Sequence, residues 1–172
     1  MPNPHEKRHP HPVLREILAA EHLRVKREVH QVVEDFFKRW GDDIFADEPK
    51  DPGRPLVLAV DHCRFKLEYL AHFLGKEGYR VSVARSGRVM LAKIAALKPR
   101  IIVTGLNVLH FYPPAYAWML ANLESEDAIP MLFVTGASAR RIPQEIPKSA
   151  RARVLSTPPD AGQLLRITRE LA

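Results

Sequence analysis

The stretch that most constrains the fold is LKPRIIVTGLNVLHF, residues Leu97–Phe111. After a proline turn it contains an uninterrupted apolar run, Ile101–Thr104, which is typical of a strand buried on both faces. Gly105 follows the run directly. Open α/β sheets bind ligands outside the carboxyl ends of their strands, so a glycine stands where such a sheet normally presents a reactive side chain.

Four more strands are predicted around this one. They cover residues 55–60, 79–84, 129–136 and 152–157, and they alternate with amphipathic segments at 65–78, 87–99, 114–125 and 160–172. Strands that alternate with helices form a parallel sheet through right-handed crossovers. We therefore expect an α/β, flavodoxin-like domain over residues 55–172, with five parallel strands in the order 2-1-3-4-5. Between the last two strands, Pro143 and Pro147 allow only a short or broken helix.

Three segments precede this domain. Residues 1–12 predict a disordered tail, and residues 41–54 an acidic linker that contains Pro and Gly. Between them, residues 13–40 predict a long amphipathic helix, whose apolar stripe includes Leu14, Leu18, Val25, Val29, Val32, Phe36 and Trp40. The stripe is broader than a coiled-coil seam. We expect it to pack on its own domain, to pair with a second copy, or to dock on a partner.

Composition bounds the class of protein. The chain has 172 residues, of which 46% are hydrophobic and 27% charged, as in globular proteins. No apolar run reaches the roughly 18 residues that a membrane span requires, and the N-terminus lacks the apolar core of a signal peptide. The single cysteine, Cys63, agrees with a cytoplasmic location. Residues 51–172 hold 17 Lys/Arg against 10 Asp/Glu, which is typical of a basic surface or of a protein with an acidic partner.

From about Arg54 onward, the chain resembles the receiver domain of bacterial two-component response regulators. The resemblance rests on VLAVDH (57–62), LGKEGYRVSVARSGRVMLAKIAALKP (74–99), IPMLFVTG (129–136) and STPPD (156–160). In that family, two acidic residues after the first strand bind Mg²⁺ and an Asp after the third strand is phosphorylated. A Lys after the fifth strand contacts the phosphoryl group, and a Thr or Ser after the fourth senses it.

Most of these functional groups are replaced here. The acidic pair is Asp61-His62, the phosphoacceptor position is Gly105, and the lysine position is Thr157, so that only Asp61 and Thr135 keep the family's residue types. Glycine offers no nucleophile, and imidazole is a poor ligand for Mg²⁺. The resemblance therefore implies a pseudo-receiver without a catalytic residue, a metal ion or a cofactor. Val154 occupies the position of the family's switch aromatic residue.

A basic cluster lies in the last third of the chain. It consists of Arg140, Arg141, Lys148, Arg151, Arg153, Arg166 and Arg169. Receiver-like proteins use the corresponding face, built from the fourth helix, fifth strand and fifth helix of the domain, for dimerisation and partner binding. We therefore expect this cluster either to bind an acidic protein partner or a second copy, or to be an ordinary solvated surface.

These observations favour a phosphorylation-independent interaction or adaptor module in bacterial signalling or cell organisation, not an enzyme. Two alternatives stay open. The altered crevice at Asp61, His62, Gly105, Thr135 and Thr157 is a candidate sensor site for a small ligand, and the basic face a candidate nucleic-acid surface. No helix-turn-helix pattern supports the latter.

Minor features point to structure more than to chemistry. His5, His9 and His11 predict a solvated tail, and Cys63 a small residue at a helix start. The aromatic residues of HFYPPAYAW (110–118) are predicted to border the crevice or to pack the third helix.

Overall fold

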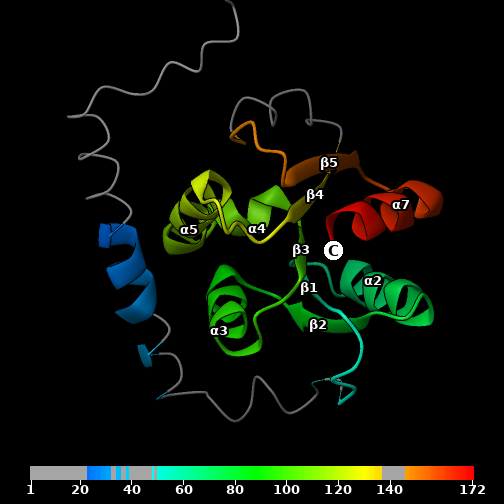
Figure 1. Ribbon diagram of the computed structural model, residues 1–172, viewed down its shortest axis with the longest axis horizontal. Helices are drawn as coiled ribbons and strands as arrows, with labels where there is room; N and C mark the ends of the chain where they lie inside the picture. The colour runs from blue at the N-terminus through cyan, green and yellow to red at the C-terminus, as the bar shows by residue number, and fades with distance from the viewer. Residues whose placement is uncertain (1–22, 32–33, 36–37, 39–47, 49, 137–145) are drawn as a thin grey trace, which may run out of the picture.

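The computed structural model describes residues 23–31, 34–35, 38, 48, 50–136 and 146–172 (Figure 1). The predicted tail, residues 1–12, and most of the predicted linker, residues 41–54, lie outside these residues. The strands are β1 Leu56–Val60, β2 Arg80–Ala84, β3 Ile101–Thr104, β4 Met131–Thr135 and β5 Ala152–Ser156. The helices are α2 Arg64–Lys76, α3 Gly87–Leu97, α4 Leu106–His110, α5 Pro113–Glu124 and α7 Ala161–Leu171.

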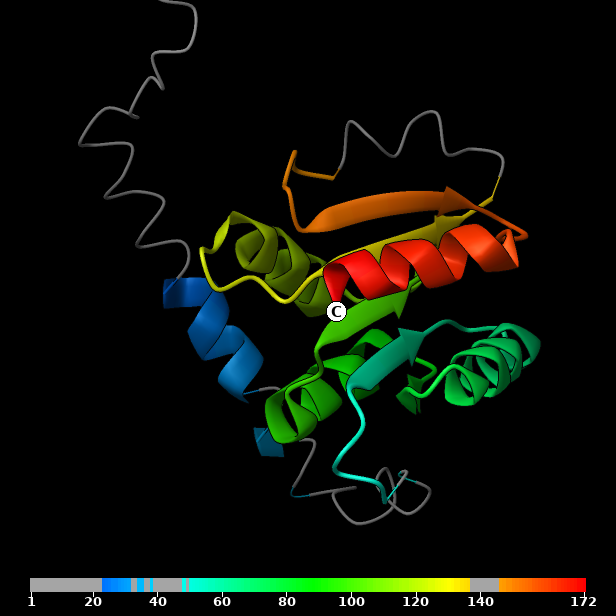
Figure 2. The same ribbon diagram turned by 45° about the vertical axis from the view of Figure 1, so that its right-hand side comes forward.

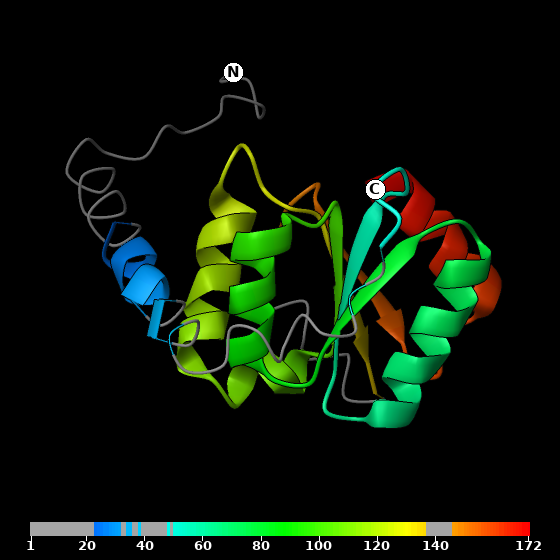
Figure 3. The same cartoon turned by 90° about the horizontal axis from the view of Figure 1, so that it is seen from below.

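The five strands form one sheet in the order β2-β1-β3-β4-β5, and all four pairings are parallel. Helices α2 and α7 cover one face, while α3, α4 and α5 cover the other (Figure 3). This confirms the predicted fold class and strand order. Since both faces are covered, the central strands β1 and β3 are buried throughout their length, which explains their continuous apolar sequences.

Each face of the sheet has its own hydrophobic core. Phe133 and Met90 are fully buried on the side of α3, α4 and α5. Leu74 and Leu164 are fully buried on the opposite side, where α2 and α7 meet the sheet. The two cores hold the sheet between its helices and fix where its strands end.

The predicted helices begin and end close to the expected residues, with one correction. Ser86 caps α3 by accepting a hydrogen bond from the Val89 amide at 3.2 Å. Gly78, expected at the end of the second helix, follows the cap residue Glu77 with φ +92°. The prediction missed α4, which begins directly after Gly105, because five residues hold too little of the 3.6-residue pattern to reveal a helix.

The described residues of the N-terminal segment, 23–31, 34–35 and 38, are helical, and residues 23–31 lie beside α5 and α3 (Figures 1 and 2). Val25 is buried, and Val29 packs against the core under α3 and α5. Through Val25 and Val29, the helix therefore packs on its own domain, which was one of the three predicted arrangements. Leu14, Leu18, Val32, Phe36 and Trp40 lie outside the described residues. Within the described ranges, we find no helix with the length and apolar character of a membrane span.

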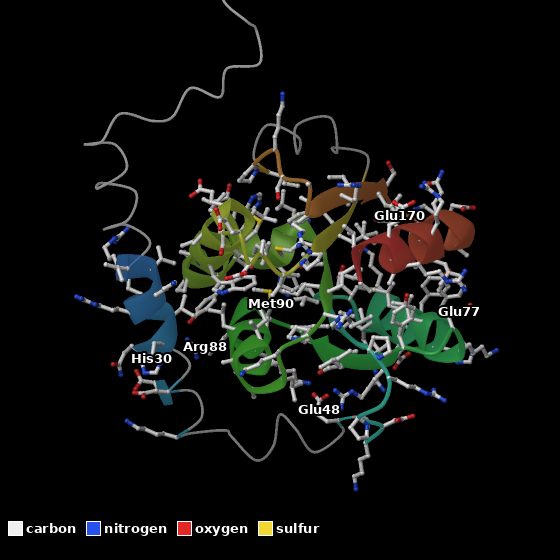
Figure 4. The ribbon with its side chains drawn as sticks, viewed as in Figure 1. His30, Glu48, Glu77, Arg88, Met90 and Glu170 are labelled. Atoms are coloured by element: carbon white, nitrogen blue, oxygen red, sulfur yellow. The ribbon has the colours of Figure 1, made fainter. Side chains whose placement is uncertain are left out.

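A buried ion pair fastens the chain just before the sheet begins. The Lys93 ammonium on α3 contacts the Glu48 carboxylate, and it donates hydrogen bonds to Ser82 Oγ at 3.1 Å and to the Val83 carbonyl at 2.8 Å. The Ser82 hydroxyl donates to the same Glu48 carboxylate at 2.6 Å. Glu48 projects toward α3 in Figure 4. The linker is thus attached to α3 and β2 at this residue.

Candidate functional site

The carboxyl ends of four strands converge on the predicted crevice. The Gly105 amide donates to the Val60 carbonyl at 3.1 Å, which aligns the chain after β3 with the chain after β1. The Thr157 amide donates to the Thr135 carbonyl at 2.6 Å, which aligns the ends of β4 and β5 in the same way. The topology that the sequence predicted therefore aligns these residues along one edge of the sheet.

Asp61 provides the carboxylate of the crevice. Its Oδ1 accepts a hydrogen bond from the Cys63 amide at 2.8 Å, at the start of α2, and its Oδ2 lies 3.8 Å from Lys66 Nζ. A Cβ atom at Gly105 would lie 3.1 Å from the same Oδ2. Gly105 and Asp61 are therefore immediate neighbours, and a side chain at position 105 would lie directly beside the Asp61 carboxylate.

His62 has contacts with two neighbouring loops. Its Nδ1 lies 3.2 Å from the Arg85 carbonyl oxygen, so this nitrogen carries the hydrogen and donates it. Its ring meets that of Phe111 edge to face, at 5.4 Å between centroids. Within the described residues no group of three or more His, Cys, Asp or Glu side chains is arranged to hold a metal ion. The imidazole acts as a connection between the chain after β1 and the segments after β2 and β3.

The hydroxyl groups of Thr135 and Thr157 are buried, and neither has a hydrogen-bond partner among the described residues. Thr104, in contrast, donates to the Gly105 carbonyl at 3.0 Å. A buried hydroxyl without a partner is unfavourable by roughly 1–3 kcal/mol. The crevice thus retains unused hydrogen-bonding capacity at the ends of β4 and β5.

A pocket of about 420 Å³ opens beside these residues, between α2, the strand ends and the loop that precedes α7. Val60, Val103 and Val134 line it from the sheet, and Phe65, Tyr69 and Leu70 from α2. Asp61, Lys66, Thr104 and Thr157 supply polar groups, and Gly105 borders it. The wall formed by α2 was not predicted from the sequence. In the sequence, this wall was indicated only by Phe65 and Tyr69, two aromatic residues on the exposed side of an amphipathic helix.

The aromatic residues of 110–118 divide between the two predicted places, the border of the crevice and the packing of the third predicted helix, which is α5. Phe111 is 76% exposed, next to His62. Tyr116 and Trp118 instead pack against the core under α3 and α5, and the ring of Tyr112 lies below the Arg88 guanidinium at 5.5 Å. Phe65, which was not singled out, is 81% exposed at the pocket.

The described residues of the predicted basic cluster lie on two parts of the domain. Lys148, Arg151 and Arg153 are exposed around the start of β5. On α7, Arg166 pairs with Glu170 at 3.0 Å, and Arg169 pairs at 3.4 Å with Glu77, the residue that caps the end of α2. The two carboxylates are labelled in Figure 4. Each of these two arginines therefore lies beside a carboxylate, which offsets part of its positive potential. Arg140 and Arg141 lie outside the described residues.

Solved structures of receiver domains are similar to this chain. The chemotaxis response regulator CheY4 of Vibrio cholerae has 23% identity and a TM-score of 0.58, covering 69% of this chain and 99% of that one. A signal receiver domain of an HD domain-containing protein from Pseudomonas fluorescens Pf-5 has 21% identity and a TM-score of 0.59, covering 69% and 94%. One from Bermanella marisrubri has 20% identity and a TM-score of 0.56, covering 69% and 98%.

No protein-family model matches the chain, and neither does any curated protein. At these identities, similarity of structure establishes the fold alone. The part of the chain from β1 to α7 has the fold of the response regulator receiver domain.

Proposed function

We propose that this protein is a receiver-like module that binds a protein partner without being phosphorylated, in bacterial signalling or cell organisation. The observation that carries the proposal is Gly105, at the end of β3 and beside Asp61, in a frame that otherwise has the receiver fold. Aspartyl phosphorylation requires a nucleophile at this position and positive charge around the phosphoryl group. Gly105 provides no nucleophile, and Thr157 provides no positive charge.

The remaining groups of the crevice support the same proposal. One oxygen of the Asp61 carboxylate accepts the Cys63 amide, the other lies 3.8 Å from Lys66 Nζ, and His62 is engaged with Arg85 and Phe111. Apolar residues line most of the neighbouring pocket. These surroundings favour contacts with another molecule over a hydrated Mg²⁺ and a phosphate, both of which require polar ligands.

The partner surface that we propose is centred on β5. Lys148, Arg151 and Arg153 expose three positive charges there, and the Arg153 guanidinium is oriented by hydrogen bonds to the Ala150 and Ala152 carbonyls at 3.0 and 2.9 Å. Val154, next to them, is 37% exposed. A charged rim around an apolar residue is suited to an acidic protein face.

Phosphorylation is tested by intact mass spectrometry after incubation with acetyl phosphate and Mg²⁺. We expect no phosphoryl adduct on the natural chain. The matched variant, His62→Asp with Gly105→Asp and Thr157→Lys, restores the family's groups and is expected to accept a phosphoryl group, provided that circular dichroism shows it folded. An adduct on the natural chain that is lost in Asp61→Asn would overturn the proposal.

Partner binding is tested by co-purification from the native host, with and without nuclease. We compare Lys148→Glu/Arg151→Glu/Arg153→Glu with a control of equal charge change, Lys76→Glu/Lys98→Glu/Arg100→Glu, whose residues are also exposed. A partner that survives nuclease and is lost only from the first variant supports the proposed surface.

Loss of the partner from both variants would mean that net charge, not the β5 surface, carries the binding. Recovery of nucleic acid alone, with an affinity that falls steeply with salt, would favour the nucleic-acid alternative instead.

A further inference from the structure

Two positions on the border of the pocket beside Asp61 carry short residues. Gly105 has no side chain, and Thr157 stands where a receiver of the resembled family has a long lysine. The resulting space of about 420 Å³ lies within the range of small-molecule sites, roughly 300–1,000 Å³. Its walls are mainly apolar, with Val60, Val103 and Val134 on one side and Leu70 on the other. Its size suits a compact apolar body such as one aromatic ring.

One oxygen of Asp61 is available to a ligand. Oδ1 is engaged by the Cys63 amide, but Oδ2 accepts no hydrogen bond from any described residue, and its nearest cation, Lys66 Nζ, is 3.8 Å away. The Asp61 side chain is only 16% exposed, so little water replaces the missing donor. A carboxylate oxygen in this situation gains most from a group that both donates hydrogen bonds and carries positive charge.

The α2 side of the pocket adds aromatic rings. Phe65 is 81% exposed and Tyr69 44% exposed, and both line the pocket. The Tyr69 ring stacks on Phe73 at 5.9 Å with an interplanar angle of 5°, which holds it in place. Aromatic faces attract cations as well as apolar bodies. We propose that this pocket binds a small organic ammonium, with its apolar body among the valines and α2 and its ammonium group at Asp61 Oδ2.

The difference in exposure between Lys66 and Asp61 predicts which charge the pocket prefers in a ligand. Its side chain is 47% exposed, whereas that of Asp61 is 16% exposed, so solvent screens the lysine more strongly than the carboxylate. An incoming ammonium displaces Lys66 Nζ from Asp61 and takes its place. An anion would meet the less screened Asp61 charge. Removal of the Lys66 charge is therefore expected to strengthen the binding of cations, which a site for anions would not show.

The proposal is independent of the proposed function, because it concerns binding by the isolated chain. The test uses three probes that share one apolar body, namely phenethylamine, phenethyl alcohol and phenylpropionate, with affinities measured by NMR titration of the full chain. We expect the amine to bind best and the carboxylate worst. Asp61→Asn should weaken amine binding by about tenfold, as expected for a partly buried ion pair, and Asn still accepts the Cys63 amide. Lys66→Met should strengthen amine binding several-fold.

Glu68→Gln serves as the control variant. Glu68 lies on α2, as Lys66 does, and its replacement removes a negative charge. Glu68 pairs with Arg64, however, and does not line the pocket. Its affinity for the amine should equal that of the natural chain. No binding of the amine, equal binding of the three probes, or unchanged binding in Asp61→Asn would overturn the proposal. The phosphorylation and co-purification results would not be affected by that outcome.

Discussion

Replacement of Lys93 by methionine tests whether the buried ion pair fastens the linker to the domain. The Lys93 side chain is 7% exposed and that of Glu48 is 16% exposed. Methionine has a similar length but no charge and no donor. The variant would leave the Glu48 carboxylate with the Ser82 hydroxyl as its remaining described donor, and it would leave the Val83 carbonyl without the lysine.

The expected loss of stability follows from this burial. Removal of one partner of a buried ion pair costs about 3–5 kcal/mol, and the partial exposure of Glu48 places this case near 3 kcal/mol. For a chain of this size, that loss lowers the melting temperature by about 6–12 °C. Glu48→Gln should cost less, about 1–2 kcal/mol, because the amide oxygen still accepts hydrogen bonds from Lys93 and Ser82. The double variant Lys93→Met/Glu48→Leu should recover most of the loss, since no charge remains buried.

Urea unfolding followed by far-ultraviolet circular dichroism measures these differences. The control is Arg166→Met, which breaks the exposed pair with Glu170 and should change the free energy of unfolding by less than about 0.5 kcal/mol. If Lys93→Met also stays within about 0.5 kcal/mol of the natural chain at an unchanged urea dependence, the reasoning is refuted. The same holds if the double variant is as unstable as the sum of its single changes.

Three further changes, each measured by thermal melting, test the packing and capping of the helices. Gly87→Ala should destabilise by about 1–3 kcal/mol, because its Cβ would lie 2.8 Å from Ala115 Cβ, whereas Gly75→Ala in α2, with open space around it, should stabilise by about 0.5–1 kcal/mol. The opposite order would contradict the close approach of α3 and α5. Ser86→Ala should cost about 1 kcal/mol by removing the acceptor of the Val89 amide, and an unchanged melting temperature would contradict that cap.

Much of this fold was predictable because its strands are buried on both faces. Runs such as Leu56–Val60 and Ile101–Thr104 are apolar throughout, and their alternation with amphipathic helices left one natural strand order. That order in turn predicted that Asp61 and Gly105 would be neighbours. The helix α4 was not predictable, because one and a half turns carry almost no periodic signal.

The parts of the site that the sequence did not reveal depend on contacts across long stretches of chain. Lys93 appears as an ordinary polar position in α3, and its partner Glu48 lies 45 residues earlier. The same limit applies to Phe65 and Tyr69. Their place on α2 was predicted, but only the packing of α2 against the sheet shows that they line the pocket.

The two attachments of the N-terminal segment determine how a competitor must act on it. Residues 23–31 are held on the domain through Val25 and Val29, and Glu48, nineteen residues after Val29 in the sequence, is held by Lys93. Even a fully extended chain of nineteen residues spans at most about 70 Å, so a detached segment stays near its docking face at an effective concentration of the order of millimolar. A separate helix that competes for the same face therefore has to outbind a local copy that never leaves. Weak competitors at micromolar concentration would leave that face covered.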